Sequence, residues 1–115
     1  MNQLLKNYAI QMDYPTVSGA EHLETLEIRD QLSEIESSFS VEDRAFLFAA
    51  DRKLMANIIA IHQELSRFID LAKYRSEQHI SPQQWWWYLD VLSYLPNTVS
   101  SIEQAPIEYR DAKSA

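Results

Sequence analysis

Cysteine is absent from the 115-residue chain, and glycine occurs only once, at Gly19, beside four prolines. Without cysteine the chain can form neither disulfides nor thiolate metal sites, and it cannot use a thiol in catalysis. So few helix-interrupting residues favour long helices and argue against a turn-rich β-fold. The sequence also lacks an uninterrupted apolar run of about 18 residues, so we expect no membrane-spanning helix and no membrane partner.

Targeting signals are missing as well. The N-terminal segment MNQLLKNYAIQMDY has no basic start, no apolar middle and no small-residue cleavage site of the secretory type. Together with the lack of cysteine, this favours a cytoplasmic location. The length fits a single domain, which we expect to span residues 1–110, with residues 111–115 forming a frayed end.

Basic residues are few, and the net charge is −7. Residues 1–43 carry 2 basic and 9 acidic side chains, whereas residues 44–75 carry 6 basic and 3 acidic ones. This asymmetry suits two helices that pair within one domain. Proteins that bind nucleic acids usually present a strong positive surface, so an acidic chain of this kind predicts no nucleic-acid partner.

Three capping patterns predict where helices begin. Ser18 with Glu21 predicts a helix over 19–37, and Ser40 with Asp43 predicts the start of another at residue 41. Ser81, followed by Pro82 at the first helical position, predicts a helix over 82–95. A short helix is also expected within residues 3–13, where apolar residues recur at helical spacing.

The segment 41–78 contains no proline or glycine and carries a wide apolar stripe. It predicts one long helix. The stripe comprises Leu47, Ala50, Leu54, Ile58, Ile61, Leu65, Phe68 and Ala72, and a second stripe beside it comprises Phe48, Met55 and Ile59.

The predicted fold is therefore all-α: an antiparallel bundle of three main helices plus a short N-terminal helix, built on one long central helix over 41–78. At 1.5 Å per residue that helix would be about 55 Å long, whereas a compact domain of this size is roughly 35 Å across. The neighbouring helices are too short to cover it. We therefore expect a symmetric homodimer, the commonest closed assembly.

The run WWWY at 85–88 places four aromatic residues in succession. On an α-helical wheel Trp85 and Tyr88 fall on the core side, while Trp87 lies at its edge together with Tyr94. Trp86 falls alone on the polar side. Because large rigid aromatics are frequent anchors of interfaces, Trp86 and Trp87 are the first candidates for a partner contact.

These patterns favour a non-enzymatic interaction or regulatory module that binds itself, and an unknown protein partner, through helix faces. The candidate interface residues are Trp86, Trp87, Tyr94, Phe48, Met55 and Ile59. The alternative is a bundle that binds a small molecule in an aromatic pocket, where a cation would suit both the rings and the acidic surroundings. That pocket would be lined by Trp85, Trp87, Tyr88 and Tyr94.

Catalytic and metal-binding signatures are lacking. No two of the three histidines lie within one helical turn, and none follows a glutamate at the spacing of di-iron bundles. An enzyme using His62 with Glu64 or Asp51 is a third, weaker hypothesis. We therefore expect no catalytic residues, no cofactor and no metal, and we identify no resemblance to a known family.

Overall fold

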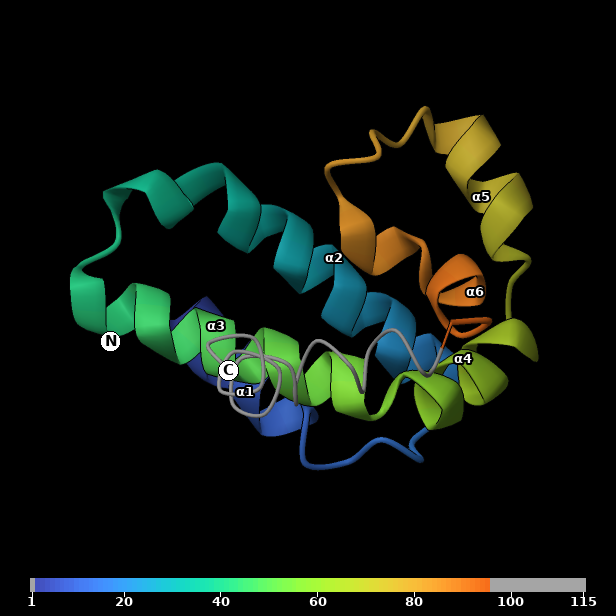
Figure 1. Ribbon diagram of the computed structural model, residues 1–115, viewed down its shortest axis with the longest axis horizontal. Coiled ribbons are helices and arrows are strands. Elements are labelled where there is room, and N and C mark those ends of the chain that lie inside the picture. Colours follow the sequence, from blue (N-terminus) through green and yellow to red (C-terminus); the bar gives the residue numbers. More distant parts are fainter. Residues whose placement is uncertain (1, 96–115) are drawn as a thin grey trace, which may run out of the picture.

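The computed structural model describes residues 2–95, and within them every regular element is helical (Figure 1). The expected all-α class is confirmed, whereas residues 96–115, including the expected frayed end at 111–115, lie outside the described part. The elements are α1 (Gln3–Gln11), α2 (Gly19–Ile35), η1 (Glu36–Ser38), α3 (Val41–Ala56), α4 (Ile58–Ser66), α5 (Leu71–Gln78), η2 (Trp85–Trp87) and α6 (Leu89–Leu92), with η denoting a 3-10 turn.

Serine caps begin two of the helices where the sequence predicts them. The Ser18 side chain accepts a hydrogen bond from the backbone N–H of Glu21 at 3.3 Å and opens α2. The Ser40 side chain accepts one from the N–H of Asp43 at 3.1 Å and opens α3. A cap acts within one turn of chain, so these starts follow from local sequence.

The single long helix over 41–78 is wrong, because the chain forms three helices there. The first break is at Asn57, whose backbone leaves the helical region (φ −106°, ψ 17°) for one residue. The Asn57 side chain donates a hydrogen bond to the Lys53 carbonyl at 3.0 Å. The i→i−4 pattern nevertheless continues on both sides, from Asn57 N–H to Lys53 and from Ile61 N–H to Asn57, so α3 and α4 keep one register.

The second break, at residues 67–70, ends the α3–α4 rod, and the chain changes direction before α5 begins. Phe68 and Ile69 both donate to the Leu65 carbonyl, which closes the last turn of α4. Asp70 then adopts an extended conformation, and its carboxylate accepts from the Lys73 N–H at 3.2 Å to open α5. The break therefore needs neither proline nor glycine: α4 ends at Ser66, and the Asp70 side chain caps the start of a new helix.

The helix expected over 82–95 is also wrong. Half of the predicted capping box forms, since the Gln84 side chain accepts from the Ser81 N–H at 3.1 Å. A 3-10 turn at Trp85–Trp87 follows, and only the four residues of α6 are α-helical.

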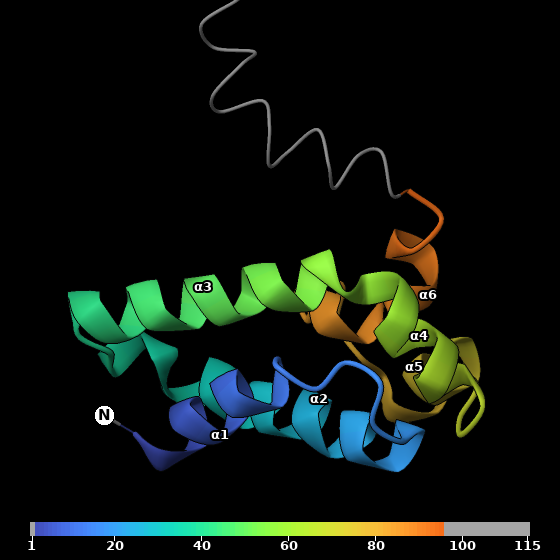
Figure 2. The same ribbon diagram turned by 90° about the horizontal axis from the view of Figure 1, so that it is seen from below.

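The centre of the fold is α2 rather than the segment 41–78. It packs against α1 and α4 and contacts the tryptophan turn η2 (Figures 1 and 2). Helix α1 also contacts α3, while α5 and α6 contact each other and α6 contacts α4. The six α-helices of residues 2–95 form a compact body with principal extents of 47 × 33 × 27 Å.

The core joins all of these helices in one apolar cluster. Its fully or almost fully buried members are Leu5, Tyr8, Met12, Leu26, Leu32, Leu47, Ala50, Leu54, Ile58, Ile61, Leu65, Leu71, Trp86, Trp87 and Leu89. The main stripe lies inside from Leu47 to Leu65, as its periodicity predicts, but its last two members, Phe68 and Ala72, are exposed because the helix ends before them. Among the helices of residues 2–95, none has both the length and the apolar character required to cross a bilayer.

The close approach of α2 and α4 depends on Gly19. A Cβ atom at this position would lie 2.6 Å from the Glu64 carbonyl oxygen and 2.6 Å from the Phe68 Cβ. Gly19→Ala should therefore lower the free energy of unfolding by about 1–3 kcal/mol, because the helices must separate to admit the methyl group.

Helix propensity alone predicts the opposite sign for Gly19→Ala, a gain of about 1 kcal/mol or less. Urea unfolding of the variant distinguishes the two effects. The neighbouring exposed position supplies the control, since Ala20→Gly should show only the propensity cost. A stabilised Gly19→Ala protein would contradict this packing.

Candidate functional site

Two successive charged residues in the middle of α2 organise the interior in different directions. The buried Arg29 guanidinium donates to the Asp51 carboxylate of α3 through Nε at 3.0 Å and Nη2 at 3.1 Å. The Tyr8 hydroxyl of α1 donates to the same carboxylate at 2.6 Å. Arg29 thereby links α2 to α1 and α3 through one shared acceptor.

Burial fixes the charge states in this group. Burial, together with the neighbouring Asp51 carboxylate, raises the pKa of Tyr8 far above its usual range, so the hydroxyl stays protonated as a donor. Burial acts to lower the pKa of Arg29, but the hydrogen bonds and charge of Asp51 outweigh it and raise that pKa above its ordinary value. The group is thus a charged pair with a neutral phenol.

The next residue, Asp30, forms hydrogen bonds with the segment 81–88, which we call the tryptophan segment. One of its carboxylate oxygens, Oδ1, accepts from the indole N–H of Trp86 at 2.7 Å and from that of Trp87 at 2.8 Å. The Gln84 side-chain amide donates to the same oxygen at 3.0 Å. Charged acceptors make the stronger hydrogen bonds, so this carboxylate attaches residues 84–87 firmly to α2.

The expected exposure of Trp86 is wrong, since the residue is only 3% exposed and Trp87 only 1%. A 3-10 turn advances about 120° per residue instead of about 100°, so an α-helical wheel misplaces this run. The Arg29 guanidinium covers the Trp86 ring at 4.2 Å, and Tyr74 stacks on Trp87 with ring centroids 4.8 Å apart. Neither indole is available to a partner in this fold.

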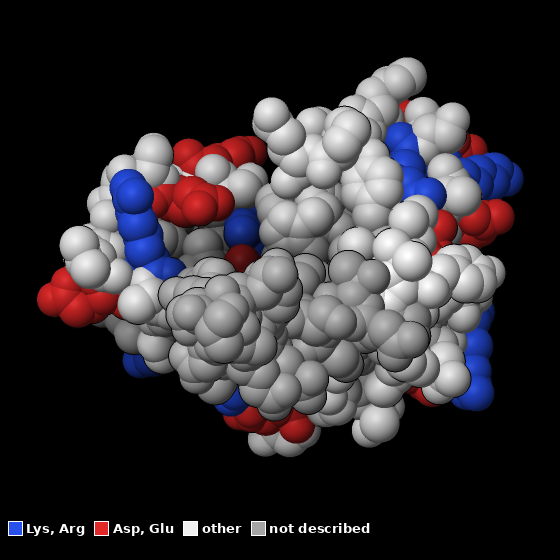
Figure 3. Space-filling model, viewed as in Figure 1, with Lys and Arg blue, Asp and Glu red and all other residues white. Residues whose placement is uncertain are grey.

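A pocket of about 510 Å³ opens beside this network, between the C-terminal half of α2 and the tryptophan segment. Figure 3 shows a hollow on this side of the molecule with charged side chains of both signs in it. The pocket is lined by Arg29, Ser33, Glu36, Ser81, Gln83, Gln84, Trp85 and Trp86.

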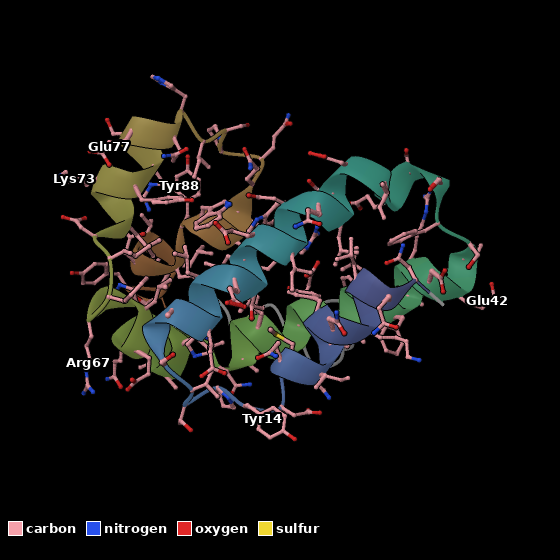
Figure 4. The ribbon with its side chains drawn as sticks, turned by 180° about the vertical axis from the view of Figure 1, so that it is seen from behind. Tyr14, Glu42, Arg67, Lys73, Glu77 and Tyr88 are labelled. Carbon is pink, nitrogen blue, oxygen red and sulfur yellow. The ribbon has the colours of Figure 1, made fainter. Side chains whose placement is uncertain are left out.

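This pocket differs from the aromatic pocket that the sequence suggests. Of the four residues proposed for that site, only Trp85 lines it; Trp85 is half-buried here, instead of being part of the core. Trp87 is covered by Tyr74, and Tyr94 is 84% exposed at the end of α6. Tyr88 lies against α5 under the Arg75 guanidinium (Figure 4). The polar residues of the pocket carry no sequence motif that would reveal them.

The second apolar stripe, on α3 and α4, remains at the surface. Phe48 is 63% exposed and Ile59 is 50% exposed, while Met55 is half-buried against the core. The interface role that the sequence predicts for these three residues and for Tyr94 remains a prediction, because the structure of residues 2–95 contains no partner chain.

A separate ion pair fastens α5 to the tryptophan segment. Both terminal nitrogens of Arg75 donate to the Asp90 carboxylate, Nη2 at 3.1 Å, and Nη1 also donates to the Trp87 carbonyl at 3.0 Å. Burial alone would raise the pKa of Asp90, but the hydrogen bonds and charge of Arg75 lower it below 3.8. The same hydrogen bonds raise the pKa of Arg75.

The chain matches no protein-family model, no curated protein and no solved structure. What the site does therefore has to follow from its own geometry. In residues 2–95 no group of three or more His, Asp or Glu side chains is placed to hold a metal ion. Nor is His62 joined there to either proposed carboxylate: Glu64 pairs with Arg67, and Asp51 is engaged by Arg29 and Tyr8.

Asp30→Ala should destabilise the protein by about 2–3 kcal/mol, because it leaves two buried indole donors without an acceptor. Tryptophan fluorescence should shift to the red as water reaches the rings. Denaturant unfolding followed by fluorescence measures both effects. Glu34→Ala is the matched control, one turn away on the exposed side of α2; equal losses in the two variants would contradict the role of Asp30.

The Arg75–Asp90 pair should make the free energy of unfolding fall as the pH is lowered into the acidic range. The pKa of Asp90 is lower in the folded protein than in the unfolded chain, so below about pH 5 the unfolded chain binds the proton first and stability falls. Asp90→Asn should cost about 1 kcal/mol at pH 7, where the contribution of the pair is complete, and less at about pH 3.

Urea unfolding at the two pH values checks this dependence. Glu77→Gln is the control, because Glu77 is exposed on α5 and points away from the body (Figure 4). An Asp90→Asn deficit of the same size at both pH values would show that the carboxylate contributes packing only.

Proposed function

We propose that the protein is a non-enzymatic interaction module that forms a homodimer through the outer face of α3 and α4. The observation that carries this proposal is the exposure of Phe48 and Ile59 on one helix face, away from the core. A cytoplasmic setting is part of this proposal, and the absence of cysteine supports it.

The spacing of this face matches that of paired helices. Its positions follow one another at intervals of four and three residues, as in a coiled-coil seam. They are Val41, Ala45, Phe48, Arg52, Met55 and Ile59, which we call the outer seam. Five of these six residues are apolar, and all six are exposed or half-buried.

The outer seam is continuous enough to receive a second helix. The i→i−4 hydrogen bonds on both sides of Asn57 keep Ile59 in register with Phe48. From Val41 to Ile59 the seam runs for about 27 Å at 1.5 Å per residue. Arg52 interrupts it, but its guanidinium lies 5.9 Å from the centroid of the Phe48 ring, so its apolar stem lies along the seam.

A second copy is the occupant that we propose. A seam at heptad spacing on one chain meets an identical seam across a two-fold axis, and closed two-fold dimers are the commonest assemblies. In such a dimer the two α3–α4 units would lie antiparallel and complete a bundle with α1 and α2 on the outside. Another protein with an amphipathic helix would use the same face by the same chemistry.

Phe48→Glu should abolish the dimer, because it places a charge in the middle of the outer seam. Light scattering across a concentration series measures the mass: the unchanged chain should approach twice its 13.4 kDa, and the variant should stay at 13.4 kDa. Because Phe48 is exposed, the variant should retain its melting temperature within a few degrees.

Ile10→Glu provides the matched control. Ile10 is an exposed isoleucine on α1, outside the outer seam, so its substitution should leave the dimer intact. A mass of 13.4 kDa for the unchanged chain at every concentration would contradict the proposal. So would equal loss of mass in both variants.

A further inference from the structure

We propose that the pocket between α2 and the tryptophan segment binds a small amino-acid-like molecule, one that carries an amine next to a carboxylate or carbonyl group. The pocket volume of about 510 Å³ lies within the usual range of small-molecule sites. This site is separate from the outer seam, so the inference does not depend on dimer formation.

Arg29 indicates that the ligand carries a hydrogen-bond acceptor, such as a carboxylate or carbonyl oxygen. This residue lines the pocket although it is only 4% exposed. Its Nε and Nη2 atoms are used by Asp51, whereas its Nη1 atom is buried without a hydrogen-bond partner among the described residues. A buried donor without an acceptor costs about 1–3 kcal/mol. Because Nη1 has almost no exposed surface, a ligand oxygen would remove that cost by displacing the partly exposed Glu36 carboxylate from beside it.

Glu36 indicates that the ligand carries an amine, because its carboxylate is an acceptor for a charged donor. Its carboxylate also lines the pocket, and its Oε1 atom lies 3.6 Å from Nη1 of Arg29, an ion-pair separation without a hydrogen bond. A ligand that satisfies both atoms needs an acceptor and a donor only a few bonds apart. The amine and carboxylate of an amino acid have this arrangement, because both are attached to one carbon atom.

The surrounding charge disfavours a simple anion. Arg29 is balanced by Asp51, while Glu36 adds a negative charge and Asp30 is held only by neutral donors. Of the lining residues only Arg29 and Glu36 are charged, and their charges cancel; Asp51 and Asp30, which bond to Arg29 and Trp86, make the surroundings negative overall and so disfavour a free carboxylate or phosphate. A zwitterion adds no net charge, and its amine is attracted to the Glu36 carboxylate.

The remaining wall suits the rest of such a molecule. The Trp85 ring, edge-on to Trp86 at 5.7 Å between centroids, offers a flat apolar surface for a ligand side chain. Ser33, Ser81 and Gln83 offer neutral donors and acceptors at the polar rim. The pocket therefore combines one apolar wall with a charged pair that would orient the ligand.

The experiment is titration of the full-length protein with each of the common amino acids, followed by calorimetry and by tryptophan fluorescence. At least one should bind saturably and change the fluorescence. Its N-acetyl derivative lacks the charged amine, and its decarboxylated amine lacks the acceptor, so each should bind at least about tenfold more weakly, equivalent to about 1.4 kcal/mol.

Two variants locate the binding site. Glu36→Gln removes the partner of the amine at an accessible position and should weaken binding at least about tenfold without unfolding the protein. Arg29→Lys tests the acceptor half, but it also removes the paired contact with Asp51, so its folding is checked by circular dichroism. Glu34→Gln, on the exposed side of α2, is the control and should bind normally.

The outcomes separate this proposal from its competitors. Absence of binding by every amino acid would overturn it, as would equal binding by the N-acetyl derivative or an unchanged affinity in Glu36→Gln. Binding that persists in the monomeric Phe48→Glu variant would support a site that works independently of the dimer.

Discussion

The carboxylate of Asp30 is the constraint on which this end of the structure depends. It accepts two indole N–H groups and one amide through a single oxygen, and these donors come from residues 84–87. The indole N–H group is a hydrogen-bond donor only, so burying two indoles in the core is favourable only where a hydrogen-bond acceptor is present. The 3-10 turn at 85–87 presents both indoles to Asp30, and the apolar bodies of the two rings then complete the core around Leu89.

Arg29 and Asp30 together explain why α2 lies at the centre. Adjacent residues on a helix point about 100° apart, so Arg29 bonds to Asp51 of α3, which also accepts from Tyr8 of α1, while Asp30 bonds to the indoles of Trp86 and Trp87. Buried charges of this kind add little net stability, because losing their hydration offsets much of the attraction. A packing that separated either charge from its partners would leave it buried and uncompensated, however, which disfavours such a packing of the same apolar surfaces.

Local signals in the sequence predict the helix starts at Ser18 and Ser40, because a cap needs only the next turn of chain. They miss the breaks at Asn57 and Asp70, where polar side chains compete with the helix and packing decides the result. The site itself had one usable signal. Arg29 lies three residues after Leu26 and three before Leu32, which are apolar, so helical spacing places it on the buried face of α2. The sequence alone does not reveal this, because an arginine is also the usual residue of an exposed face.

The broken helix changes the reason for expecting self-association without removing it. The length argument fails, since no rod over 41–78 exists. The exposure argument does not require a rod: on α3 and α4 the buried residues and the outer seam lie on different faces, about 140° apart at 100° per residue. Within residues 2–95 the helices that contact α3 and α4 are mainly α1, α2 and α6, and this packing leaves Phe48 and Ile59 exposed. The fold of residues 2–95 accounts for the buried stripe, and the exposed stripe is the feature on which our proposal of a second copy rests.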